Sequence, residues 1–194
     1  MPAIKKELNF SELTPDKWKD IEKLFGPKGA SAGCWCMWWK LSKLQFEKQI
    51  GEKNKKAFKN TVQSNHVPGI IAYYKGEPVG WCAIEPRESF SRLESSQILK
   101  PVDDKPVWSI VCFYIKKEFR RVGVSKALIK AAVNYARKKK AKIVEGYPLD
   151  LSKKEKYPGA VVYHGTMSSF EAAGFREVLR RSDTRPIMRY YISK

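Results

Sequence analysis

The order of apolar and polar positions predicts two helices in the first third of the chain. Residues 14–25 carry apolar side chains at helical spacing, behind a Thr14 cap and a Pro15 at the first helical position. Residues 45–62 repeat a helical pattern, which is broken near Gly51. Each segment is expected to bury one face.

Strand-like segments are more numerous. The run GIIAYYKGEPVGWCAIEP predicts a hairpin, and PVWSIVCFYI is so continuously apolar that it suits a strand buried on both faces. The long excursion between these two runs is expected to hold a short helix at most. The expected strands lie, in chain order, at residues 4–10, 70–74, 79–85, 106–115, 141–148, 175–181 and 187–192.

A helical pattern at 122–139 separates the long apolar strand from the strand that follows it. This order predicts a βαβ unit, and hence a sheet that is partly parallel. The run SSFEAAGF predicts a short helix with Ser168 and Glu171 as a capping box and Gly174 as its end. The last two strands would close the sheet as an antiparallel pair, which gives a mixed α/β fold.

Composition supports one globular domain spanning residues 1–194, with 43% hydrophobic and 12% aromatic residues. The net charge of +18 predicts attraction to nucleic acid, acidic protein or a phosphorylated ligand. A solvated, lysine-rich surface would account for the same charge. No run approaches the ~18 apolar residues of a membrane span, and no secretory apolar segment opens the chain. A cytoplasmic location without membrane association is therefore expected.

The four cysteines are then expected to be reduced. Cys34 and Cys36 flank Trp35, which is not the paired CxxC spacing of a zinc site. Only His66 and His164 would add imidazole ligands, so no metal is predicted.

The stretch EFRRVGVSKAL, residues 118–128, stands where the long apolar strand passes into a helix. The N-terminus of a helix presents unpaired main-chain N–H groups and a partial positive charge. Gly123 leaves that main chain accessible, and Arg120, Arg121 and Lys126 add positive charge. These features predict a phosphate or pyrophosphate site, although an ordinary strand-to-helix turn with basic surface residues would look similar. The stretch is neither a Walker loop nor a GxGxxG fingerprint.

The longer stretch FYIKKEFRRVGVSKALI resembles the acetyl-CoA-binding motif of the GNAT superfamily of N-acetyltransferases. That motif is an apolar strand followed by Q/R-x-x-G-x-G/A at a helix start, and Arg120, Gly123 and Ser125 take its three defining places. SFEAAGF resembles the family's later Y-E-x-x-G-F motif, and the order of elements agrees over most of the chain. CWCMWW and PVWSIVCFYI resemble segments of a largely uncharacterised bacterial and archaeal subgroup. The resemblance implies the GNAT-like acyl-CoA N-acyltransferase fold, a central mixed sheet flanked by helices.

The resemblance also implies acetyl-CoA as co-substrate. Main-chain N–H groups of the loop would hold its pyrophosphate, and strand residues would pair with its pantetheine arm in a cleft between the fourth and fifth strands. The implied cofactor-binding residues are Phe113, Ile115, Arg120, Arg121, Val122, Gly123, Val124, Ser125 and Lys126. An amine would attack the thioester directly, which calls for a base, a donor to the thioester oxygen and an acid for the thiolate.

The chain departs from the family where the acid is usually found. Phe170 occupies the tyrosine position of Y-E-x-x-G-F and has no proton to donate. Tyr163 and His164 precede the same helix and are candidate acids. Glu85, at the end of a central strand, is a candidate base and otherwise a solvated strand end. Ser168 is expected to be a helix cap rather than a catalytic residue.

The acceptor site is expected near GCWCMWWK, where the resemblance places the acceptor-binding helices. Trp35, Trp38 and Trp39 would form an aromatic wall for an apolar or cationic acceptor, or would be core residues. The leading hypothesis is an N-acetyltransferase for a small-molecule amine, as a monomer or homodimer. The alternatives are a protein acetyltransferase of the same fold and a basic nucleic-acid-binding module. The last is disfavoured because the aromatic residues lie within apolar runs.

Overall fold

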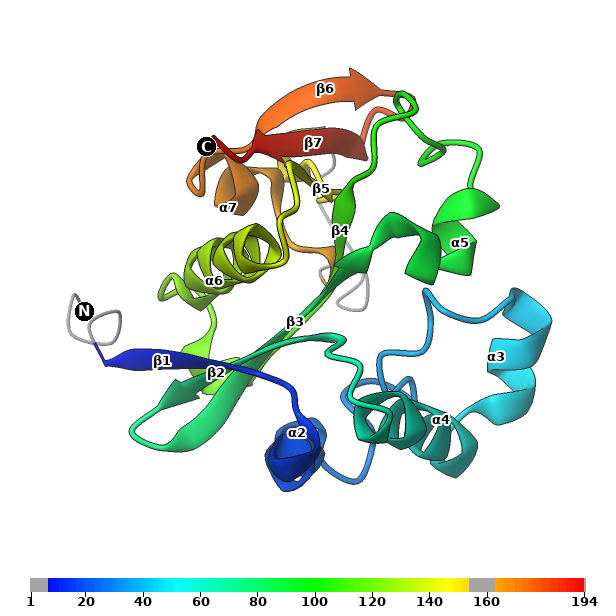
Figure 1. The fold of residues 1–194 in the computed structure, drawn as a ribbon, viewed down its shortest axis with the longest axis vertical. Helices are drawn as coiled ribbons and strands as arrows, with labels where there is room; N and C mark the ends of the chain where they lie inside the picture. Colours follow the sequence, from blue (N-terminus) through cyan, green and yellow to red (C-terminus); the bar gives the residue numbers. More distant parts are fainter. Residues whose placement is uncertain (1–6, 154–162, 194) are drawn as a thin grey trace.

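The computed structural model describes residues 7–153 and 163–193 (Figure 1). Seven strands form one sheet in the order β1-β2-β3-β4-β5-β7-β6. The β4–β5 pair is parallel and the other pairs are antiparallel. The strands are β1 (Leu8–Glu12), β2 (Gly69–Tyr74), β3 (Glu77–Pro86), β4 (Trp108–Ile115), β5 (Ile143–Gly146), β6 (Arg176–Arg180) and β7 (Pro186–Tyr191).

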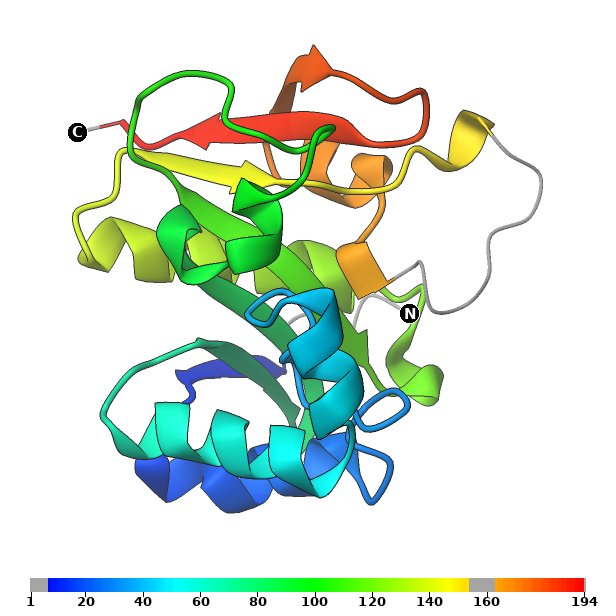
Figure 2. The same cartoon turned by 90° about the vertical axis from the view of Figure 1, so that its right-hand side faces the viewer.

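Helices cover both faces of this sheet (Figures 1 and 2). One hydrophobic core joins the N-terminal helices to β3 and β4, and a second joins α6 and α7 to the opposite face. The helices are α2 (Trp18–Phe25), α3 (Lys43–Gln49), α4 (Glu52–Gln63), α5 (Ser91–Glu94), α6 (Val124–Lys138) and α7 (Met167–Glu171). Short 3-10 turns lie at η1 (Pro15–Lys17), η2 (Arg87–Ser89), η3 (Lys117–Phe119) and η4 (Leu151–Lys153).

The centre of the sheet opens between its two parallel strands. The β4–β5 ladder covers only Trp108 to Ile110 on β4, opposite Val144 to Gly146, whereas β4 continues to Ile115. Beyond Ile110 the edge of β4 is therefore not paired with β5. This end of β4 leads directly through η3 into α6, so the opening and the start of α6 lie in the same region of the molecule.

Most of the expected elements are confirmed, including the hairpin, the βαβ unit and the closing antiparallel pair. Gly51 separates α3 from α4 with a φ of 87°, a left-handed conformation that favours glycine. The first strand begins at Leu8 rather than residue 4, and part of its expected range lies outside the described residues.

The predicted capping role of Ser168 is wrong. Helix α7 begins at Met167, so Ser168 is already inside its first turn. Thr166 is the cap, because its main chain is extended and its Oγ1 accepts a hydrogen bond from Ser169 N at 3.3 Å.

Within the described ranges, no helix combines the length and the apolar character that crossing a bilayer requires.

Candidate active site

A groove lies where the end of β4 meets the start of α6. It has a volume of about 520 Å³ and includes the main positive side chains of the loop, Arg120 and Arg121. Arg120 Nε donates to Ile115 O at 2.9 Å, which fixes the loop against the strand. The groove is lined by Phe113, Ile115, Phe119, Arg120, Arg121, Val124, Ser125, Leu151, Tyr163, Gly165, Thr166 and Ser169.

The loop brings the helix start to this groove through two left-handed residues. Arg121 has a φ of 62° and Gly123 a φ of 90°. The first main-chain bond of α6 runs from Ala127 N to Gly123 O at 3.2 Å. The N–H groups just before Ala127 have no acceptor one turn back in the helix, so an anion in the groove would meet unpaired donors and the positive end of the helix dipole.

Ser125, the departure from the family's glycine or alanine, has a structural role. Its Oγ lies 3.2 Å from Ser169 Oγ, which in turn lies 2.9 Å from Thr166 Oγ1. These three hydroxyls connect the first turns of α6 and α7 across one side of the groove. A serine is thus accommodated where a larger side chain would fill the groove.

The structure brings most of the predicted cofactor residues to this groove. Among its lining residues are Phe113, Ile115, Arg120, Arg121, Val124 and Ser125. Val122, Gly123 and Lys126 are not among them, and their part in binding the cofactor stays a prediction. The Ile115 carbonyl accepts one hydrogen bond from Arg120, and its second lone pair and its N–H remain for the predicted pairing with a ligand.

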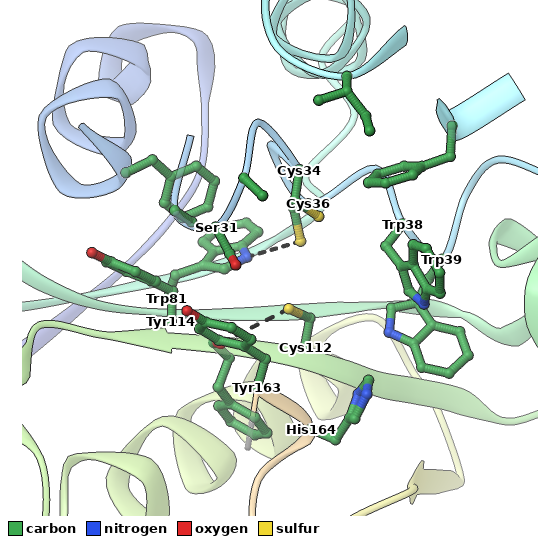
Figure 3. A pocket seen from close by; sticks show the side chains of 16 residues that line it. Ser31, Cys34, Cys36, Trp38, Trp39, Trp81, Cys112, Tyr114, Tyr163 and His164 are labelled. Carbon is green, nitrogen blue, oxygen red and sulfur yellow. Dashed lines mark hydrogen bonds between the residues drawn. The ribbon is translucent and has the colours of Figure 1, made fainter. Parts of the chain in front are cut away.

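A second cavity, of about 350 Å³, lies between the C-terminal half of β4 and the N-terminal helices (Figure 3). Aromatic rings and thiols dominate its wall. Its lining comprises Phe25, Ala30, Ser31, Ala32, Cys34, Cys36, Trp38, Trp39, Phe46, Ile50, Trp81, Cys112, Phe113, Tyr114, Tyr163 and His164.

The three tryptophans predicted as an acceptor wall are divided by the fold. Trp38 and Trp39 line the cavity, whereas Trp35 does not and is only 3% exposed. Its ring stacks on Trp18 at a centroid distance of 6.1 Å, within the core. The expectation of Trp35 as a wall residue is therefore corrected. Trp35 and Cys36 both have positive φ, so this segment turns sharply and consecutive side chains leave in different directions.

Tyr163 and Phe113 line both the groove and the cavity. The Tyr163 ring lies nearly parallel to that of Tyr114, with a centroid distance of 6.4 Å and an interplanar angle of 14°. Gly165, two residues on, has a φ of 77°, so the chain bends sharply after Tyr163. Tyr163 therefore stands at the junction of the two spaces.

His164 lines the cavity beside Tyr163 and packs edge-on against Trp39, with centroids 5.3 Å apart. Its Nδ1 lies 3.1 Å from Val111 O. A carbonyl oxygen only accepts, so Nδ1 carries the proton and Nε2 of the neutral ring carries a lone pair. Burial, together with the nearby charge of Arg185, lowers the pKa of His164 to about 4. His164 is therefore neutral near pH 7, which disfavours its predicted role as an acid.

Glu85 is not the solvated strand end that was the alternative to its predicted role as a base. It is 1% exposed and so is not a solvated strand end, and it is not among the cavity-lining residues. Its carboxylate accepts from Lys40 Nζ at 2.7 Å and also contacts His66 Nε2. Lys40 directly follows Trp39, so this buried pair connects the tryptophan segment to β3.

Three thiols line one side of the cavity. Trp81 Nε1 donates to Cys36 Sγ at 3.2 Å. Hydrogen bonds from the Cys112 thiol and from Trp81 lower the pKa of Cys36, whereas burial raises the pKa of Cys34 to about 11. Among the described residues, no group of three or more His, Cys, Asp or Glu side chains is arranged to hold a metal.

Some cavity residues were not identified from the sequence. Cys112 and Tyr114 alternate along β4, so strand periodicity alone places them on one face. Phe46 and Ile50 come to the cavity from α3 and the residue after it, and no sequence signal marks them as site residues.

Phe170, at the position of the family's tyrosine, is a core residue. It is fully buried, 6.0 Å from Phe113 between ring centroids, and it lines neither space. A Cβ on Gly146 would lie 2.1 Å from the Phe170 ring, so this glycine makes room for it at the end of β5.

The model of the GNAT acetyltransferase family matches residues 35–146. Solved structures share the fold over nearly the whole chain. PaiA N-acetyltransferase from Thermoplasma acidophilum, in complex with coenzyme A, has a TM-score of 0.53 and 15% identity, covering 95% of this chain and 99% of that chain. A GNAT-family acetyltransferase from Listeria monocytogenes has a TM-score of 0.58 and 8% identity, covering 95% of each chain. One from Streptococcus pneumoniae has a TM-score of 0.54 and 13% identity, covering 96% of this chain and all of that chain. A search of curated protein sequences gave no match.

Proposed function

The chain belongs to the GNAT acetyltransferase family and is an acyl-CoA-dependent N-acetyltransferase with acetyl-CoA as co-substrate. We propose that it acetylates the primary amine of a small molecule, and that this amine attacks the thioester directly. The observation that carries this proposal is the meeting of two spaces at Phe113 and Tyr163. One is a basic groove at a helix start and the other is a walled apolar cavity. A thioester and an amine that enter from opposite sides would meet at these two residues.

The groove has the chemistry that CoA requires. In the proposal, main-chain N–H groups at the start of α6 hold the pyrophosphate, with Arg120 and Arg121 adding positive charge. The part of β4 toward Ile115, which is not paired with β5, receives the pantetheine arm. Bound acetyl-CoA supplies an activated acetyl group, and the chain itself positions that group and handles protons.

The transfer forms one N–C bond and breaks one C–S bond, while one proton leaves the amine nitrogen and one reaches the sulfur. In the proposal, His164 Nε2 accepts a hydrogen bond from the amine and orients its lone pair toward the junction. The Tyr163 hydroxyl donates a proton to the departing sulfur; the proton that leaves the nitrogen passes to solvent, and Tyr163 regains its proton from solvent. Glu85 is left out of this path, because it is buried in a pair with Lys40 and does not line the cavity.

The groove assignment is tested by titrating acetyl-CoA into the protein in a calorimeter. Gly123→Glu places bulk and negative charge at the helix start, and we expect it to weaken binding at least about 100-fold, or roughly 2.7 kcal/mol. Gly76→Glu is the matched control, since Gly76 also has a positive φ, of 81°, and lies in the β2–β3 turn with open space around it. Equal affinities of the two variants would mean that the pyrophosphate binds elsewhere.

A protein acetyltransferase needs an open groove for its peptide, whereas the second cavity is walled by side chains from α2, α3 and the tryptophan segment. This feature supports a small acceptor over a protein one. The alternative of a nucleic-acid-binding module is further disfavoured by the burial of most aromatic rings in the two cores. A cytoplasmic, single-domain monomer or homodimer remains the expectation from sequence.

A further inference from the structure

The acceptor cavity is strongly apolar for a site that binds an amine. Of its sixteen lining residues, all of them in the described part of the chain, none is Asp, Glu, Lys or Arg. A second ammonium group on the acceptor would therefore be buried without a counter-charge, which is costly. The net charge of +18 opposes polycationic acceptors at longer range as well.

The surroundings of Trp38 favour an acceptor with an apolar body over one with a cationic body. The Arg92 guanidinium lies 3.7 Å from the centre of the Trp38 ring and also approaches Phe46. A second cation at Trp38 would meet the charge of this guanidinium. The ring is also held edge-on to Phe46 at a centroid distance of 5.0 Å, so it offers a fixed apolar surface.

The far end of the cavity has apolar side chains that the fold leaves uncovered. Trp38 is 39% exposed and Ile50 is 51% exposed, although both line the cavity. Figure 3 shows Trp38 across the cavity from Tyr163 and His164. The polar end with Tyr163 and His164 therefore suits the nitrogen, and the opposite end suits an apolar group.

The cavity has the size of a small-ligand site, and one of its wall residues carries a buried donor without a partner in the described part of the chain. Trp39 is 7% exposed, and its Nε1–H has no hydrogen-bond partner among the described residues. The cavity volume of about 350 Å³ is near the lower end of the range for ligand pockets, about 300–1,000 Å³.

We propose that the acceptor is an arylalkyl monoamine, with its nitrogen beside Tyr163 and His164 and a one- or two-ring apolar body against Trp38, Phe46 and Ile50. This inference rests on the proposed function and specifies its substrate class. The reaction is the acetyl transfer described above, with the amine of this compound as the nucleophile.

The test measures kcat/KM with the full chain and acetyl-CoA, by chromatographic detection of acetylated product because the protein itself carries free thiols. The panel is 2-phenylethylamine, tryptamine, propylamine, spermidine, kanamycin and a lysine-containing peptide. We expect the two aryl amines to exceed propylamine and spermidine by at least about tenfold, from burial of the ring.

Two matched variants locate the effect. Ile50→Glu puts a carboxylate at the apolar end. Leu44→Glu makes the same change on α3, which ends just before Ile50, at a residue that is 61% exposed and does not line the cavity. We expect Ile50→Glu to lower kcat/KM for 2-phenylethylamine at least about tenfold and to raise that for spermidine, with Leu44→Glu within about twofold of the parent. Trp38→Ala should reduce the aryl preference in the same direction.

A preference for spermidine, kanamycin or the peptide would overturn the acceptor class while leaving N-acetyltransfer standing. Faster turnover with hexanoyl-CoA than with acetyl-CoA, abolished by Trp38→Ala, would show that the cavity holds an acyl chain and would also overturn it. Acetyl-CoA binding without acetylation of any amine in the panel would instead refute the proposed small-molecule function, and this inference with it.

Discussion

The burial of His164 predicts that the protein loses stability in acid. The chain has two histidines, and His164 is held neutral by burial with a pKa of about 4, against a usual value near 6.5. The unfolded chain binds this proton more readily than the native state does between these two values. Stability is therefore present above about pH 6.5 and is lost as the pH falls toward 4.

The size of the effect follows from the shift. A difference of about 2.5 pH units corresponds to about 3 kcal/mol, and the partial exposure of the side chain reduces this to about 2 kcal/mol. His164→Gln removes the titration, and its amide can still donate to Val111 O. We expect the parent to lose about 2 kcal/mol more than this variant between pH 7 and pH 4.

The assay is urea unfolding at a series of pH values, followed by tryptophan fluorescence. His66→Gln is the control, because it also removes one histidine but leaves Val111 and His164 unchanged. Its pH dependence should keep the contribution from His164. If the parent and His164→Gln lose the same free energy of unfolding over this range, then His164 is not held neutral, and the assignment of a lone pair to Nε2 is wrong.

The remaining predictions concern the reaction. Tyr163→Phe keeps the ring stacked on Tyr114 but removes the hydroxyl, so kcat should fall at least about tenfold with acetyl-CoA affinity unchanged; a parental kcat in single-turnover measurements would remove Tyr163 from the mechanism. Glu85→Gln removes the carboxylate that pairs with Lys40, so the free energy of unfolding should fall by about 3 kcal/mol. The pH dependence of the rate should stay unchanged. A pH–rate profile displaced to higher pH would restore Glu85 as the base.

The sequence by itself determined the order of elements and the position of the cofactor loop. Both are local properties: apolar periodicity defines helices and strands over short windows, and the loop at Arg120 to Lys126 depends on a strand, a glycine and a helix start that are consecutive in the chain. The same locality explains why the hairpin and Gly51 were placed correctly.

The tertiary structure decided which side chains share a cavity. The sequence does not distinguish the three tryptophans at positions 35, 38 and 39. The left-handed main chain at Trp35 and Cys36 places the Trp35 side chain in the core. The tautomer of His164 depends on Val111, more than fifty residues earlier in the chain. The burial of Glu85 depends in the same way on Lys40. Such contacts arise when distant segments pack against one sheet, and no periodicity within a single segment specifies them.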